Sequence, residues 1–137
     1  RGFPRDAKDK VGMLFWRMHR CARIIFSLRY HLEKLTPQEC IDLLVDKVGH
    51  EYANAEAEIR KSFERSYGPL YQIAYMVGAL ALVALRKEVV DSGQMEEKAF
   101  HDLILTQNTM PIEILRAKVT GEMLDRDHKA SWRFLED

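Results

Sequence analysis

The apolar residues of this sequence recur at spacings of three and four, which is the period of an α-helix. No segment of convincing length alternates apolar and polar residues as a half-buried strand does. The four prolines, Pro4, Pro37, Pro69 and Pro111, each stand where a helix could begin, the position at which a helix tolerates proline. At 137 residues the chain fits one domain with a real core, so we expect a single all-α domain over residues 1–137.

We expect about six helices, of which the first and the fourth are long. The expected ranges are about 9–34, 37–48, 52–65, 69–91, 96–105 and 111–120. The strongest local signal is Thr36-Pro37-Gln38-Glu39, which predicts a capping box at the start of the second helix. Gly49, Gly93 and Gly121 stand where the second, fourth and sixth helices should end.

The first helix carries an apolar stripe, which predicts an amphipathic helix with one face against a partner. The stripe consists of Leu14, Met18, Cys21, Ile25, Leu28 and Leu32, and is widened by Phe15, Ala22 and Phe26. The fourth helix is apolar nearly all round and should be central. We interpret Cys21 and Cys40 as buried thiols. Residues 1–8 and 122–137 are expected to be flexible or docking ends, with Trp132 and Phe134 able to dock.

Charge and length exclude several classes of protein. Lys plus Arg and Asp plus Glu both total 21, and this balance argues against a nucleic-acid binder. The apolar run 70–85 is shorter than the roughly 20 residues of a membrane span, which favours a buried helix. The chain opens without methionine or a signal stretch, and its two cysteines have no Cys-x-x-Cys spacing. We therefore expect a piece of a longer helical protein, with a cytoplasmic location favoured.

No metal-binding motif is evident. His50-Glu51-Tyr52-Ala53-Asn54 is the nearest approach to a zinc-peptidase helix, but Asn54 stands where the second histidine ligand belongs. A solvent-facing start of the third helix is the better interpretation, and we expect no metal ligands in this chain. Glu97 and His101 lie four residues apart, a spacing typical of a surface carboxylate–imidazole pair.

Three polar features allow both a structural and a functional interpretation. Arg17, Arg20 and Arg23 form a solvated face or, if buried, must meet carboxylates. Tyr67, Tyr71 and Tyr75 recur every four residues. They are core tyrosines with bonded hydroxyls, or they present a hydroxyl to a cleft, where it could stabilise an oxyanion. His31, near the end of the first helix, is more often a helix-end cation than a catalytic group.

Several segments follow one another in order over about 11–119. They are Arg23-Ile24-Ile25 with His31, Leu35-Thr36-Pro37-Gln38-Glu39, Pro69 with Tyr75 and Gly78, Leu85-Arg86, Phe100-His101-Asp102 and Met110-Pro111-Ile112. The ordered set resembles the C-terminal part of a bacterial family known as domain of unknown function 885, whose members are described as zinc-dependent peptidase-like proteins. Ser27 stands where the family often has aspartate. Gln72 comes three residues after Pro69, where the family often has two.

The resemblance implies a helical portion that forms one wall of a peptidase cleft. Tyr75 would face the tetrahedral intermediate, with Arg23, His31, Tyr67, Arg86 and His101 as substrate-binding or supporting groups. The metal-binding histidines would lie upstream, so zinc belongs to the longer parent and this chain alone would be inactive. Expected partners are the rest of the parent chain and a peptide substrate, with no nucleic acid and no membrane.

Two other functional interpretations remain open. The chain could be a non-catalytic helical scaffold or protein-interaction domain, in which the tyrosine and arginine lines are purely structural. If the apolar faces of the first and fourth helices are left uncovered, they should also drive formation of a homodimer.

Overall fold

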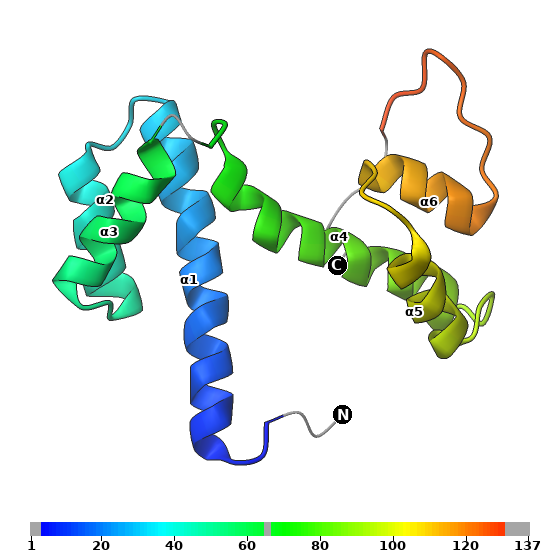
Figure 1. The fold of residues 1–137 in the computed structure, drawn as a ribbon, viewed down its shortest axis with the longest axis horizontal. Helices are drawn as coiled ribbons and strands as arrows, with labels where there is room; N and C mark the ends of the chain where they lie inside the picture. The colour runs from blue at the N-terminus through cyan, green and yellow to red at the C-terminus, as the bar shows by residue number, and fades with distance from the viewer. Residues whose placement is uncertain (1–3, 65–66, 131–137) are drawn as a thin grey trace. The chain divides into compact units, whose positions relative to one another are not determined.

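All secondary structure in the computed structural model, which describes residues 4–64 and 67–130, is helical (Figure 1). The α-helices are α1 (Ala7–His31), α2 (Pro37–Leu43), α3 (Tyr52–Phe63), α4 (Ala74–Arg86), α5 (Glu97–Thr106) and α6 (Ile112–Thr120). The π-helical turns η1 (Leu44–Val48) and η3 (Lys87–Asp91) continue α2 and α4, and the 3-10 turn η2 (Tyr71–Ile73) precedes α4. The predicted all-α architecture is confirmed. Across these described residues, no helix is long and apolar enough to cross a membrane.

The chain divides into two compact units, Arg1–Met76 and Val77–Asp137, each with its own hydrophobic core. In the first unit, α2, η1 and α3 pack against α1, and the first turns of α1 extend past them (Figure 1). The buried residues of this core are Ala22, Phe26, Cys40, Ile41, Leu44, Val48, Ala55 and Ile59. Aromatic stacking closes one end of this core, where the ring centroids of Tyr30 and Phe63 lie 3.4 Å apart.

Local backbone chemistry explains the sharp connection between α1 and α2. Glu33 adopts the left-handed conformation (φ 55°), the amide of Glu33 donates to the Tyr30 carbonyl and the amide of Lys34 donates to the Arg29 carbonyl. These are the two hydrogen bonds of a Schellman motif, which ends a helix. The predicted capping box follows at once: the Thr36 amide donates to Glu39 Oε2 (2.8 Å), and the Glu39 amide donates to Thr36 Oγ1 (3.3 Å).

The structure corrects the predicted orientation of the apolar stripe on α1. The face buried against the first unit carries Phe15, His19, Ala22 and Phe26, whereas the stripe itself lies on the surface. Cys21 belongs to that stripe and is exposed, so the prediction of a buried thiol there was wrong. The sequence shows that apolar residues cover a wide part of the surface of α1. It does not show which part of that surface the neighbouring helices cover.

The second unit encloses a smaller core. It contains Leu85, Val89, Phe100 and Leu115, which come from α4, η3, α5 and α6. Arg116 on α6 forms two hydrogen bonds with Glu88 on η3, which closes one side of this core with a charged pair. We expected the fourth helix, apolar nearly all round, to be central, but Ala79 and Val83 on α4 are exposed. Gly93 and Gly121 have positive φ at the predicted helix ends, and Trp132 and Phe134 lie outside the described residues.

The capping box gives a direct test of how α2 is held. Thr36→Ala removes the acceptor for the Glu39 amide and should lower the free energy of unfolding of the first unit by about 1 kcal/mol. Thr36→Ser keeps a hydroxyl in place and should cost much less. Urea titration compares both variants with the unmodified chain, and equal losses would contradict the assignment.

Candidate functional site

An ion pair between Arg23 of α1 and Glu58 of α3 ties together the two longest helices of the first unit. The guanidinium Nη2 contacts Glu58 Oε1, and the two side chains are only 14% and 16% exposed. Arg17 and Arg20, the other members of the predicted arginine line, are exposed. Arg23 is therefore the one that is removed from water, and it meets a carboxylate as a buried guanidinium must.

Arg23 also lies beside the three tyrosines that recur every four residues, which contact one another. Its guanidinium carbon lies 5.5 Å from the centroid of the Tyr75 ring, within the range of a cation–π contact. The hydroxyls of Tyr71 and Tyr75 are hydrogen-bonded at 2.9 Å, and the Tyr67 ring stacks on Tyr71 with centroids 4.5 Å apart. All three residues are between 38% and 48% exposed, so they are not core tyrosines. We call Arg23, Tyr67, Tyr71 and Tyr75 the tyrosine cluster.

The hydrogen bond inside the tyrosine cluster affects acidity. It raises the pKa of Tyr71 above its usual value, because its hydroxyl is bonded to Tyr75 and a second ionised phenol nearby would be repelled. Tyr71 therefore remains a neutral phenol at physiological pH. A neutral phenol can donate a hydrogen bond, which an ionised one cannot do.

The chain enters α4 through a strained backbone. Leu70 has φ 66°, a left-handed conformation that costs a residue with a side chain about 1 kcal/mol or more. Two residues later, the Gln72 side chain is 3% exposed, and neither of its amide atoms has a hydrogen-bond partner within the described residues. Strain and unsatisfied polar groups of this kind cluster at functional sites. They lie here directly beside Tyr71 and Tyr75.

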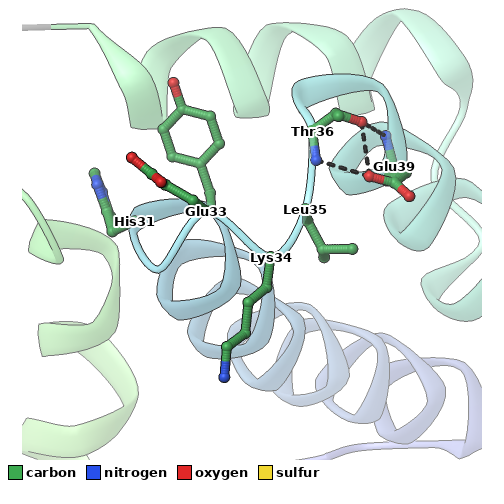
Figure 2. Close-up of a pocket in the computed structure, with 7 residues that line it drawn as sticks. His31, Glu33, Lys34, Leu35, Thr36 and Glu39 are labelled. Carbon is green, nitrogen blue, oxygen red and sulfur yellow. Dashed lines mark hydrogen bonds between the residues drawn. The ribbon is translucent and has the colours of Figure 1, made fainter.

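His31 belongs to a different neighbourhood. It lines an open hollow of about 620 Å³ at the C-terminal end of α1, together with Tyr30, Glu33, Lys34, Leu35, Thr36 and Glu39 (Figure 2). Its ring contacts Tyr30, with centroids 5.3 Å apart. Neither Arg23 nor any residue of the tyrosine line is among the residues that line this hollow.

Arg86 and His101 meet in the second unit through a shared carboxylate. Arg86 Nε donates to Glu97 Oε1 at 3.2 Å, and its Nη1 donates to Asp91 at 2.8 Å. His101 Nε2 lies 3.6 Å from the same Glu97 oxygen, the surface carboxylate–imidazole pair that the spacing predicted. The six candidate residues thus fall into three groups: Arg23 with Tyr67 and Tyr75, His31 at the hollow, and Arg86 with His101.

A histidine pair, of which His19 is buried and His50 half-buried, is the feature that sequence reasoning missed. His50 Nε2 lies 2.8 Å from His19 Nδ1, although the two residues are 31 positions apart. The aromatic rings of Phe15 and Trp16 pack beside them. His50 is thus half-buried rather than simply solvent-facing. One signal was present: His19 falls at helical spacing between Phe15 and Ala22, on the buried face of α1.

Burial keeps both imidazoles neutral. Desolvation, reinforced by the nearby Arg23 charge and opposed by Glu58, lowers the pKa of His19 from 6.5 to about 4. Desolvation likewise lowers the pKa of His50. Within residues 4–64 and 67–130, no group of three or more His, Cys, Asp or Glu side chains could hold a metal ion. The residues described do not fit a zinc centre.

The histidine pair should make the stability of the first unit depend on pH. The pKa of His19 is lower in the folded chain than in the unfolded chain. As the pH falls below about 6.5, the unfolded chain therefore binds more protons than the folded chain does. Stability is complete above that pH and should fall by about 2 kcal/mol between pH 7.5 and pH 5 from His19 alone. Urea unfolding followed by Trp16 fluorescence, in a Trp132→Phe background, measures this loss.

The control for this experiment is another histidine. His19→Gln should abolish most of the pH-dependent loss, whereas the exposed His101, replaced as His101→Gln, should leave it unchanged. If His19→Gln retains the full loss, other groups titrate and the explanation is wrong.

The ion pair gives a second stability test. Glu58→Gln leaves the Arg23 charge buried without its partner and should lower the free energy of unfolding by about 3 kcal/mol. Glu56→Gln removes the exposed neighbouring carboxylate, 3.6 Å from Arg60, and should cost less than about 0.5 kcal/mol. Replacing both buried partners, Arg23→Met with Glu58→Leu, should recover most of the loss. Equal effects of the two single variants in urea titrations would contradict this account.

Comparison with known proteins places the chain in a family. A family model described as "Bacterial protein of unknown function (DUF885)" matches residues 1–119. No curated protein and no solved structure matches the chain significantly. The match covers most of the chain, including every candidate residue of the three groups above. The chain therefore belongs to this bacterial family of unknown function.

Proposed function

We propose that this chain is the C-terminal helical portion of a metal-dependent peptidase and forms one wall of its substrate cleft. The observation that carries the proposal is the environment of Tyr75. Tyr75 is 48% exposed, yet its hydroxyl is bonded to Tyr71 and its ring faces the Arg23 guanidinium. A hydrogen-bond donor that is held in place but reachable from solvent is suited to bind an oxyanion.

Each contact of Tyr75 supports that role. The cation beside the ring draws electron density from the phenol and makes its hydroxyl a better donor. Arg23 is itself held by Glu58, so the cation does not need to reorganise when substrate arrives. Tyr71 stays neutral, and its hydroxyl orients that of Tyr75. Tyr75 would then donate to the carbonyl oxygen of a peptide as negative charge develops on it.

The remaining candidates have supporting roles in this proposal. Tyr67 stacks on Tyr71 and extends the aromatic surface along which a peptide could lie. His31, Arg86 and His101 are assigned to substrate binding by family resemblance. Arg86 is already engaged by two carboxylates, which suits it to hold Glu97 rather than to bind substrate directly.

The metal would come from a part of the parent protein beyond these residues, since the described side chains do not form a site for it. The chain by itself would therefore lack hydrolytic activity. Its contribution would be the cleft wall and the tyrosine donor.

The decisive experiment compares Tyr75→Phe with wild type in the full-length parent protein, using a peptide library with and without added zinc. We expect Tyr75→Phe to lower the zinc-dependent kcat about 100-fold or more with little change in KM, because an oxyanion donor acts in the transition state. Tyr52→Phe is the matched control: Tyr52 is a half-exposed tyrosine on α3 whose hydroxyl donates to Gln38, and the loss of this hydroxyl should not change the rate. Circular dichroism verifies that both variants fold.

One observation favours a different class of function, a non-catalytic interaction domain. Arg23 and Arg86 are both engaged by carboxylates, as expected of groups that stabilise helix packing. Unchanged zinc-dependent activity in folded Tyr75→Phe would assign the tyrosine cluster to this structural role. Absence of activity in the wild-type parent across the library would favour the interaction domain directly.

A further inference from the structure

The exposed apolar stripe of α1 has the repeat of a coiled-coil seam. Its members are Val11, Leu14, Met18, Cys21, Ile25, Leu28 and Leu32, which follow one another at alternating spacings of three and four. This is the a/d pattern of a heptad repeat, sustained over about three heptads. Apart from Cys21, which is also exposed, these side chains are between 40% and 66% exposed. We call these seven residues the α1 seam.

The α1 seam is distinct from the face that builds the first unit. Phe15, His19, Ala22 and Phe26 hold α1 against α2 and α3. The seam therefore adds nothing to that core. Single exposed apolar residues are ordinary, but a continuous row along a whole helix marks an interaction site. The strict 3.5-residue period indicates that its partner is another helix, because only a helix supplies matching knobs and holes.

The charges beside the α1 seam indicate the chemistry of the partner. Between Lys10 and Leu32 the sequence contains no Asp or Glu, although the whole chain is electrically neutral. Four cations of this segment, Lys10, Arg17, Arg20 and Arg29, have no ion pair within the described residues, whereas Arg23 is engaged by Glu58. In the heptad, Lys10 and Arg17 occupy g positions and Arg29 occupies an e position. These are the positions that pair with charges on a partner helix.

We propose that the α1 seam docks an amphipathic α-helix of a partner protein, whose own a and d residues are apolar and whose flanking residues are Asp and Glu. A second copy of α1 would present the same cations and no acidic residue to meet them, so it fits the charge pattern less well. The inference does not depend on the peptidase proposal, because the tyrosine cluster and the seam share no residue.

Two designed peptides test the proposal on the full chain. Both have three heptads with Leu at a and d; one carries Glu at every e and g position and the other carries Lys. The acidic peptide should bind saturably and should slow alkylation of Cys21, which lies in the seam. Cys40 is buried, and burial raises the pKa of its thiol to about 11, so it serves as an unreactive internal reference.

Variants then locate the binding surface. Met18→Glu places a charge in the seam and should weaken binding of the acidic peptide at least about tenfold. Arg17→Glu should weaken it by up to about fivefold and improve binding of the basic peptide. Leu105→Glu is the matched control: Leu105 is an equally apolar residue on α5 that is 82% exposed, and its replacement should have no effect.

Three outcomes would overturn the proposal. Equal binding of the two peptides would show that the partner helix does not need to be acidic. Sedimentation that shows a dimer abolished by Met18→Glu would assign the seam to a second copy of the chain. Failure of both peptides to protect Cys21 at millimolar concentration would show that the α1 seam does not dock a helix.

Discussion

The ion pair between Arg23 and Glu58 contributes both to helix packing in the first unit and to the electrostatic environment of Tyr75 and His19. It spans α1 and α3, which also meet through the aromatic rings of Phe26, Tyr30 and Phe63. The same guanidinium lies beside the Tyr75 ring, and its charge adds to the effect of burial, which lowers the pKa of His19. A charge that has lost water must be compensated, so the carboxylate, the ring and the neutral imidazoles form one electrostatic unit.

The arrangement gives α1 two separate functions on adjacent faces. One face carries large and small groups in alternation and closes the core, and the other carries the uncovered α1 seam. An α-helix has 3.6 residues per turn, so a row that repeats every 3.5 residues stays on one side over only a few turns. The row on α1 is about that long, which suits a seam that meets one helix along its length.

Local signals in the sequence predicted the fold well. The capping box at Thr36 and Glu39 and the glycines at positions 49, 93 and 121 act over four or five residues, and all four signals mark helix ends in the structure. The all-α class followed from periodicity, which is also local. The tertiary packing of the helices could not be predicted from the sequence in the same way. Whether a neighbour covers the Leu14 face or the Phe15 face of α1 depends on α2 and α3, which pack by shape.

The candidate site shows the same division. Tyr67, Tyr71 and Tyr75 recur every four residues in the sequence, and their rings are neighbours in the structure. The cation that meets Tyr75 comes from elsewhere in the chain, since Arg23 precedes Tyr75 by about fifty residues. Likewise His50, which follows the left-handed Gly49 at the end of η1, meets His19 on α1. Such contacts are set by loop geometry and core packing. The charge on Arg23 is already balanced by Glu58, so a substrate near Tyr75 would meet an oriented phenol beside a nearly neutral pair rather than a free cation. On the proposal that Tyr75 binds an oxyanion, the site would therefore act through a preorganised hydrogen-bond donor rather than through a net positive charge.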